Sequence, residues 1–297
     1  MKKFLSLVCL WVLSLEAVHA AATNEPAAPL PSERTGNTRY GLFDGLDHRS
    51  FYSEGNFPEP FLVDDSGLEI NEARLDWLHT RADGQTDDTI TAEVEKGFGL
   101  LTVEVEIPYV REQADGRTVD GFDNLDLGAR YPFYQWVSRN GFFDTTLGAA
   151  AELGIPVDST ISQNTEVVPK IFNDIKIGEH LTVQSILGYS TLFGPGEAGG
   201  SQTFEYGFVL GCTLQHRELP IPGVLQAIPI CELTGDTGLN RGDAGRNTLL
   251  GDAGFRFNLN TLGRVQPRLG VVYVFPLDEN ARAVARSGVD VSLVFEY

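Results

Sequence analysis

The chain of 297 residues is 42% hydrophobic and contains 32 glycine and 18 phenylalanine residues, enough apolar material for one sizeable core. Its 41 acidic side chains outnumber the 22 basic ones, and the formal charge is −19. Nucleic acid is therefore not an expected partner, because phosphate groups require a basic face.

The first 20 residues have the pattern of a secretory signal peptide. Two lysines precede an apolar run from Phe4 to Leu15, and the small residue Ala20 offers a cleavage point. The run is shorter than the roughly 20 apolar residues that a membrane helix requires. We predict export with cleavage after Ala20, and an uncleaved membrane anchor is the alternative interpretation.

Residues 21–66 contain several proline and glycine turns and no sustained periodicity of apolar residues. This composition predicts an extended or loosely folded N-terminal segment. Such a segment could occupy the interior of the following domain as a plug.

Over residues 67–297, apolar and polar residues alternate almost continuously, which is the period of a β-strand with one apolar and one polar face. Near the end of the chain, for example, Val291 and Leu293 share one face and Ser292 lies on the other. Twelve strands are predicted, at about 68–79 (with a bulge near Asn71), 89–96, 101–110, 122–131, 142–153, 165–176, 180–191, 203–215, 226–235, 248–258, 265–275 and 288–297.

An even number of antiparallel strands, each about ten residues long, is typical of bacterial outer-membrane barrels. An open sheet cannot cross lipid, because its edges leave unpaired backbone N–H and C=O groups in hydrocarbon. Every second connection is generally longer and more polar, as expected for extracellular loops opposite short periplasmic turns. We therefore predict an all-β, antiparallel up-and-down transmembrane β-barrel of about 12 strands over residues 67–297, in the outer membrane of a Gram-negative type of cell. A secreted soluble β-sandwich is the alternative.

Two aromatic residues of the predicted lipid-facing set, Phe295 and Tyr297, lie at the end of the chain. Rings at this position belong to the aromatic girdle at the membrane interface, where outer-membrane lipid is their partner. A terminal aromatic strand also resembles the signal of bacterial outer-membrane proteins that the barrel assembly machinery reads. This resemblance implies an assembly role for both residues.

Several stretches resemble one family of outer-membrane barrels. They are TAEVEKGFGLLTVEVEIPYV, GFDNLDLGARYPF, AAAELGIPVDS, GDAGFRFNLN and VVYVFPLD, and together they span roughly residues 67–297. The family is the one described as "MetA-pathway of phenol degradation", and the pattern departs from it at GIPVDS, where the family's Thr-Gly-Asp is absent. The resemblance implies a barrel that passes aromatic or other hydrophobic small molecules, and it implies no particular site residues.

If the apolar faces contact lipid, the opposite faces line the lumen. The residues predicted there are Arg74, Asp76, Glu93, Glu95, Glu104, Glu106, Asp126, Arg130, Glu152, Glu166, Lys170, Asp174, Lys176, Glu205, Glu232, Arg256, Arg268, Asp290 and Glu296. The set is acidic on balance, which favours a polar pathway for cations or neutral solutes. We predict a passive channel for small molecules, with the hydrophobic or aromatic ones that the family resemblance implies among its candidate solutes. A structural or adhesive barrel, closed by a packed network of ion pairs, is the alternative, because 12 strands lie between filled and open barrels.

No catalytic, cofactor or metal site is predicted. The four histidines that follow the signal peptide, among them His79, form no HExxH or other spaced cluster, and no GxSxG elbow is present. A barrel lipase-type hydrolase with His79 as the base is the least favoured alternative. The stretch that holds Asp236, Asn240 and Asp243 lacks the ligand spacing of an EF-hand, so a flexible loop is preferred to a Ca²⁺ site.

Two cysteines remain after the signal peptide, Cys212 and Cys231, on consecutive predicted strands. If the turn between them is centred between Ile221 and Pro222, the two cysteines lie opposite each other on one face of a hairpin. That spacing overlaps the range that a disulfide tolerates, and the periplasm is oxidising. We predict a cross-strand disulfide, and the alternative is two unbonded thiols that face lipid.

Overall fold

The structure, a computed structural model, describes residues 36–38, 57–64, 71–263 and 265–297. The predicted signal peptide, most of the segment at 21–66 and the first residues of the strand expected at 68–79 lie outside these ranges. Within them, no helix is long and apolar enough to cross a membrane.

Almost all of the described chain is β-strand. The strands are β1 (Gly36–Thr38), β2 (Asn71–Ala82), β3 (Gln85–Phe98), β4 (Leu101–Ala114), β5 (Arg117–Phe122), β6 (Asn124–Val137), β7 (Phe143–Pro156), β8 (Thr165–Ile177), β9 (Leu181–Phe193), β10 (Gln202–Cys212), β11 (Leu214–Gln215), β12 (Val224–Gly238), β13 (Asn247–Leu259), β14 (Gln266–Pro276) and β15 (Ser287–Glu296). Two short helices lie in connections, η1 (Arg241–Asp243) and α3 (Glu279–Val284).

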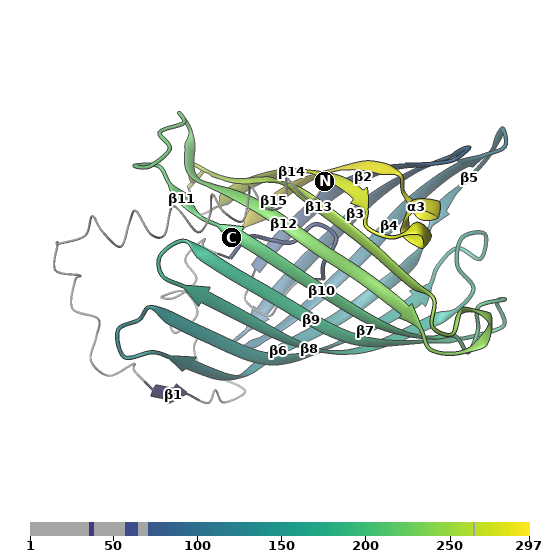
Figure 1. The fold of residues 1–297 in the computed structure, drawn as a ribbon, viewed down its shortest axis with the longest axis horizontal. Helices are drawn as coiled ribbons and strands as arrows, with labels where there is room; N and C mark the ends of the chain where they lie inside the picture. The colour runs from purple at the N-terminus through teal and green to yellow at the C-terminus, as the bar shows by residue number, and fades with distance from the viewer. Residues whose placement is uncertain (1–35, 39–56, 65–70, 264) are drawn as a thin grey trace.

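The strands form one antiparallel barrel that closes on itself (Figure 1). The last strand, β15, pairs with the first barrel strand, β2, from Glu296 opposite Glu72 to Ser287 opposite Arg81. Strands β5 and β6 both pair with β4 and are two parts of one strand, interrupted at Asp123. With the short β1 and β11 set aside, the barrel has 12 strands, so the predicted fold is confirmed.

The two faces of the barrel wall follow the predicted alternation. On the outer face, Val105 is 46% exposed, and Trp77 and Phe208 are exposed in the same way. On the inner face, Glu95 and Glu232 are fully buried. Successive side chains of a strand point to opposite faces, so each strand carries apolar groups outward and charged groups inward. This arrangement is the reverse of a soluble domain and suits a barrel that lipid surrounds.

We give names to the two ends of the barrel. The terminal end is the end at which β2 begins and β15 ends. The loop end is the opposite end, on the right in Figure 1, where α3 lies. Two loop-end hairpins close with two-residue turns, at residues 83–84 and 115–116. Gly84 and Gly116 have φ of 76° and 74° there, values that glycine adopts without strain. The other loop-end connections, residues 157–164, 194–201, 239–246 and 277–286, are longer.

Several strand boundaries differ from the prediction. The stretch RADGQTDD, expected to be a loop, is mostly strand, because β2 and β3 continue to a tight turn. The expected turn PFYQWVSRNG belongs largely to β6, which continues past a bulge at Phe133. The expected loop after β14 contains the short helix α3. The Asp278 carboxylate caps the first turn of this helix, because it accepts a hydrogen bond from the Ala281 N–H at 2.7 Å. From Asn71 onward, β2 pairs with β3 in a constant register, so no bulge follows Asn71.

The predicted disulfide between Cys212 and Cys231 is wrong for the structure. Strand β12 places Leu210 opposite Cys231, and Leu214 of β11 opposite Ala227. The turn is therefore centred one residue earlier than expected, between Pro220 and Ile221. The two cysteines are then diagonal neighbours, about 7–8 Å apart in such a ladder, which exceeds the Cα distance of a disulfide. No bond joins their sulfur atoms.

Candidate functional site

Residues Phe57–Asp64 lie inside the barrel, and we call them the inserted segment. One wall residue, the fully buried Glu232 of β12, holds its centre. The Glu232 carboxylate accepts hydrogen bonds from the backbone N–H groups of Phe61, Leu62 and Val63 at 2.8, 3.0 and 3.1 Å. Three donors on one carboxylate are charge-assisted hydrogen bonds, the stronger kind in proteins, so this contact fixes the segment against the wall.

The carbonyl groups of the inserted segment are also bound. Arg74 of β2 and Arg256 of β13 both donate to the Pro60 carbonyl oxygen, at 2.9 and 3.1 Å. Gln184 of β9 donates to the Pro58 carbonyl oxygen at 2.7 Å. The guanidinium of Arg256 also lies 4.3 Å from the centre of the Phe61 ring, a cation–π distance. Four strands of the wall, including β12, therefore bind the backbone of this segment.

One carboxylate of the inserted segment, Glu59, is fully buried. It forms an ion pair with Arg268 of β14 at 3.3 Å, and Arg268 also pairs with Glu296 near the chain end. Burial alone raises the pKa of Glu59. Attraction by Arg268, a hydrogen bond with Glu72 and the nearby Arg256 and Arg74 outweigh burial and lower that pKa to about 2.

Glycines in the barrel wall make room for the inserted segment. A Cβ at Gly207 would lie 2.4 Å from Val63 Cγ1, and one at Gly270 would lie 2.4 Å from Phe61 Cζ. A Cβ at Gly211 would lie 2.7 Å from Pro58 Cγ. Real side chains do not approach that closely. Glycine at these three wall positions therefore lets the inserted segment pack closely against the wall, in addition to the hydrogen bonds that bind it.

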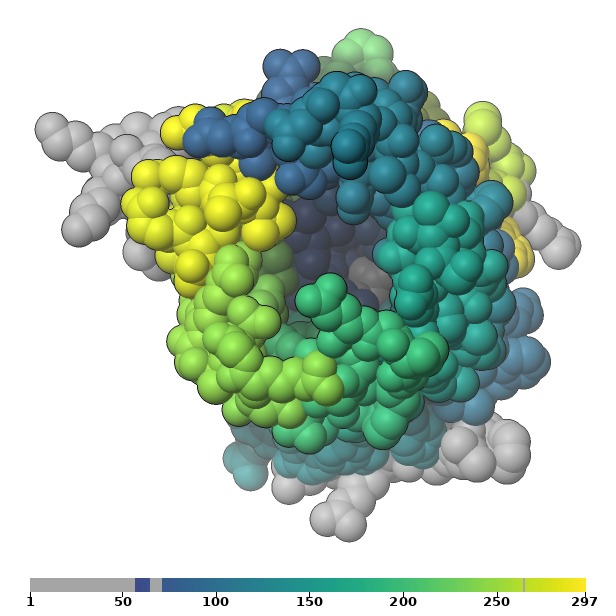
Figure 2. All heavy atoms as spheres, turned by 90° about the vertical axis from the view of Figure 1, so that its right-hand side faces the viewer, coloured from purple at the N-terminus to yellow at the C-terminus, as the bar shows by residue number. Residues whose placement is uncertain are grey.

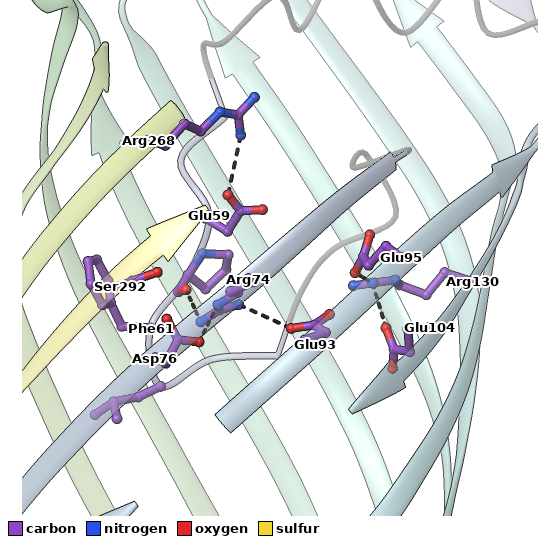
Figure 3. A network of polar contacts seen from close by, with 12 residues as sticks. Glu59, Phe61, Arg74, Asp76, Glu93, Glu95, Glu104, Arg130, Arg268 and Ser292 are labelled. Carbon is purple, nitrogen blue, oxygen red and sulfur yellow. Dashed lines mark hydrogen bonds and ion pairs between the residues drawn. The ribbon is translucent and has the colours of Figure 1, made fainter. Parts of the chain in front are cut away.

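Ion pairs link the inner walls around this segment (Figure 3). Arg74 pairs with Asp76 and lies 3.8 Å from Glu93. Arg130 pairs with Glu95 and, at 2.5 Å, with Glu104. Since all these groups are almost completely removed from water, each arginine offsets carboxylates whose burial would otherwise be costly.

A cavity of about 560 Å³ occupies the loop-end half of the interior. Residues 61–64 of the inserted segment form its floor, and Lys170 of β8 pairs with both Asp64 and Glu152 at this level. Figure 2, viewed from the loop end, shows the hollow between the strands. Nine acidic side chains line the cavity and only three basic ones: Asp64, Asp76, Glu93, Glu104, Glu106, Glu166, Glu205, Asp236 and Asp290 against Arg74, Arg130 and Lys170.

The structure places most of the predicted lumen residues in two groups, and two of the remaining three form ion pairs, Glu152 with Lys170 and Glu296 with Arg268. Those that line the cavity are Arg74, Asp76, Glu93, Glu104, Glu106, Arg130, Glu166, Lys170, Glu205 and Asp290. Others lie in the interior beyond the cavity lining, namely Glu95, Asp126, Asp174, Glu232, Arg256 and Arg268. Sequence reasoning missed Glu59, Asp64, Glu72, Asp236 and Asp252. Glu59 and Asp64 follow no strand period, and Asp236 was assigned to a loop, so only Glu72 and Asp252 had an alternation that pointed inward.

No nucleophile accompanies the histidine considered as a catalytic base. His79 Nδ1 lies 2.8 Å from Asp88, and its Nε2 accepts a hydrogen bond from Arg81 at 3.0 Å. A Ser–His–Asp arrangement requires a serine hydroxyl at that second nitrogen. The contacts of His79 within the described chain therefore do not support the hydrolase alternative.

Metal binding has weak support within the described residues. One group of three carboxylates, Glu72, Glu93 and Glu95, brings oxygen atoms within 4.8 Å of one another. Arg130 already pairs with Glu95 and Arg74 lies near Glu93, so the charge that a cation would neutralise is partly offset. In the loop with Asp236, Asn240 and Asp243, the Asn240 side chain accepts a hydrogen bond from the Gln202 N–H and donates one to the Gly200 carbonyl oxygen. These contacts stabilise the loop without a Ca²⁺ ion.

Comparison with known proteins agrees with this architecture. No protein-family model and no curated protein matches the chain. Among solved structures, the chain is similar to an outer membrane channel from Pseudomonas putida F1, with 14% identity over 80% of this chain and 99% of that one and a TM-score of 0.52. NanC porin matches with 10% identity over 77% and 99% of the two chains and a TM-score of 0.44. LpxR from Salmonella typhimurium matches with 8% identity over 76% and 100% and a TM-score of 0.39.

At this level of identity the first of these likenesses shows the fold alone. Together with the observed faces of the wall, it defines the class of the molecule. The chain forms a closed antiparallel barrel with an apolar outer face and a charged interior, the architecture of barrels that cross the bacterial outer membrane.

Proposed function

We propose that the protein is an outer-membrane channel for small solutes, exported by its N-terminal signal peptide and inserted with its termini in the periplasm. The acidic cavity at the loop end is the observation that carries this proposal. A barrel that served only as a scaffold has no need for a cavity of about 560 Å³ lined by charged groups. The likeness of the fold to an outer membrane channel supports it.

The charge of the lining supports selectivity for cations and neutral solutes. Acidic side chains outnumber basic ones by nine to three, and a ring of carboxylates in a pore attracts cations and repels anions. The resemblance to the phenol-degradation family adds aromatic or hydrophobic small molecules as the finer candidate. Leu78, Leu192 and Leu250 in the lining offer apolar contacts for such solutes.

Passage through the barrel requires that the inserted segment move. Phe57, Phe61 and Val63 are buried in the terminal-end half, together with fully buried wall residues such as Glu232 and Arg256. A solute that enters the cavity therefore meets the floor of residues 61–64 before it reaches the terminal end. We infer that the described state is closed and that displacement of this segment opens the path.

A structural barrel without a conducted solute is the second candidate. The specific observation in its favour is the same inserted segment, because its hydrogen bonds to four strands are those of a permanent core element. The two candidates differ in one measurable property, which is whether release of the segment produces a conducting pore.

Conductance of the purified protein in planar bilayers tests this difference. The intact chain is compared with a variant that lacks residues 57–64, after a gel-shift assay on heating has shown that both barrels fold. We expect the deletion to raise conductance and to reveal a preference for K⁺ over Cl⁻. A folded deletion variant that passes no ions contradicts the channel and supports the structural barrel.

The location and the orientation of the wall are tested separately. Val105 faces outward and Glu106, its neighbour in β4, lines the cavity. A lysine on the lipid face costs about 2–4 kcal/mol at the membrane midplane. Val105→Lys should therefore reduce the folded barrel in outer-membrane fractions, whereas Glu106→Lys should leave its amount unchanged. Recovery of the intact protein as a soluble periplasmic species contradicts the membrane location.

A further inference from the structure

The loop-end cavity contains carboxylates that the barrel itself does not neutralise. Glu106, Glu205, Asp236 and Asp290 line it from four different strands. Within the described chain none of the four has a hydrogen bond or an ion pair, and basic side chains attract them only from longer distances: Arg74 attracts Glu106 and Asp290, Lys170 attracts Glu205, and Arg246 attracts Asp236. These four residues, which we call the open carboxylates, give the cavity a surplus of negative charge.

The basic side chains of the cavity are already engaged elsewhere. Arg74 is bound to Asp76 and to the Pro60 carbonyl oxygen, and Arg130 is bound to Glu95 and Glu104. Lys170 is bound to Asp64 and Glu152. No basic side chain of the described cavity lining is therefore left over to pair with the open carboxylates.

Asp290 is the strongest single sign of a missing partner. Its side chain is on β15 and lines the cavity, and the residue is only 3% exposed. Its Oδ1 atom is buried and has no hydrogen-bond partner. A buried ionised carboxylate without a partner is costly, so a positively charged group that enters the cavity recovers free energy at this position.

We propose that the loop-end cavity binds a small organic cation, a primary amine carried on an apolar body. This inference deepens the proposed channel function and rests on it, because it names the class of solute that the cavity takes up. The ammonium group contacts Asp290 or a second open carboxylate, and the others add to the negative charge that attracts it. The apolar body lies on the floor and wall formed by Phe61, Leu62, Val63, Leu78 and Ile186, all of which line the same cavity.

The distribution of the carboxylates favours an organic cation over a metal ion. Three ligand oxygens within 4.8 Å of one another occur, among the described residues, only at Glu72, Glu93 and Glu95, and none of the open carboxylates belongs to that group. A metal ion needs several oxygens converging at about 2–2.6 Å. A primary ammonium group instead needs only one or two carboxylate oxygens at hydrogen-bond distance, and carboxylates on other strands attract it from farther away. The cavity volume of about 560 Å³ is in the range of small-molecule sites.

Binding of three probes of similar shape to the purified full-length barrel in detergent tests the proposal. The probes are phenethylamine, 2-phenylethanol and 3-phenylpropionate, which carry a positive, a neutral and a negative group on the same ring. Isothermal titration should show phenethylamine bound at least tenfold more tightly than the alcohol, and no binding of the acid. Equal binding of the amine and the alcohol overturns the proposal.

Variants assign the binding to the cavity. Asp290→Asn and Glu205→Gln should each weaken phenethylamine binding about five- to tenfold and leave 2-phenylethanol unaffected. Asp252→Asn is the matched control, because Asp252 is a fully buried interior aspartate that does not line the cavity, and it should bind the amine normally. If both cavity variants fold, by the gel-shift assay, and bind phenethylamine as the parent does, the site is wrong.

The experiment also separates this site from the channel. Binding in detergent does not require passage, so amine binding by a barrel that never conducts supports the site and contradicts the channel. Conduction by the variant without residues 57–64, together with no preference for the amine in the intact protein, supports the channel and overturns the organic-cation site.

Discussion

The same strands form the wall of both halves of the barrel interior, but the halves differ in whether their carboxylates have hydrogen-bond or ion-pair partners. In the terminal-end half, Glu232 is fully buried and accepts three backbone hydrogen bonds, and Glu59 is paired with Arg268. In the loop-end half, Glu106 and Asp290 line a cavity without such partners. A carboxylate enclosed by protein keeps its charge only where hydrogen bonds or opposite charge replace the water it loses.

This difference separates two roles within one barrel. The terminal-end half is filled by the inserted segment and provides closure and rigidity, while the loop-end half remains open enough to receive a solute. Changes in the first half should therefore alter stability and closure, and changes in the second should alter selectivity. Four predictions test this division, and they begin with the largest expected effect.

Loss of the Glu232 carboxylate should release the inserted segment. Glu232→Ala leaves the N–H groups of Phe61, Leu62 and Val63 without their acceptor, and removal of a buried charged partner costs about 3–5 kcal/mol. Amide hydrogen exchange at these three positions should become fast, and conductance should rise. Glu205→Ala, in the loop-end half, is the control that should leave exchange slow, and equal protection in both variants would break the comparison.

Acid should release the segment through Glu59. Its pKa is lowered from 4.5 to about 2, so it contributes stability that is complete above about pH 4.5 and is lost as the pH falls through 2. The shift corresponds to roughly 3 kcal/mol, at 1.36 kcal/mol per pKa unit. The free energy of unfolding, measured in urea, should fall in this window for the parent and stay flatter for Glu59→Gln.

The control for this pH dependence is an acid at the loop end. Asp158 is in the exposed connection 157–164, and hydrogen bonds from Thr160 lower its pKa. Asp158→Asn should leave most of the acid-induced loss of stability in place, because solvent reaches this carboxylate and screens it. A parent protein that is equally stable at pH 5 and pH 2 would show that Glu59 does not hold the segment as the structure indicates.

Alanine in place of a wall glycine should destabilise the barrel more next to the inserted segment than next to the loop-end cavity. Gly207→Ala places a methyl group 2.4 Å from Val63, and such overpacking costs about 1–3 kcal/mol. At Gly188, in the loop-end half, the nearest atoms are 3.2 Å or more away and belong to side chains such as Glu205 that can move. Gly188→Ala should change the free energy of unfolding by less than about 0.5 kcal/mol, as surface-like substitutions do. Equal destabilisation by both substitutions would show that the segment is not closely packed.

The smallest effect on stability is expected at an open carboxylate. Glu104 and Glu106 lie on the same inner face of β4, but Glu104 pairs with Arg130, whereas Glu106 has no ion pair with any residue that the structure describes. Glu106→Gln should alter the free energy of unfolding by no more than about 0.5 kcal/mol. It should nevertheless lower the K⁺ over Cl⁻ permeability ratio of the variant without residues 57–64. Glu104→Gln should be the more destabilising of the two, because it leaves Arg130 with one partner fewer.

Sequence reasoning reached the architecture because strand alternation is a local property. The polarity of Val105 and Glu106 is enough to assign one to lipid and the other to the interior, since neighbouring residues of a strand point to opposite faces. The number and order of the strands follow from repeating this reading along the chain. Strand ends were less accurate, because the tight turn at residues 83–84 and the bulge at Phe133 depend on how neighbouring strands pair.

The sequence suggested a plug within residues 21–66, but only tertiary structure decided which residues enter the barrel and where they bind. The inserted segment has no period that marks it, and its partners are distant in the chain: Phe61 and Glu232 are separated by 171 residues. The predicted cysteine pairing is wrong for a related reason, since moving the centre of the turn by one residue places Leu210, and not Cys212, opposite Cys231. Polarity along the chain determines which face of each strand is buried, whereas register and docking depend on the shapes of surfaces that meet only after the barrel has closed.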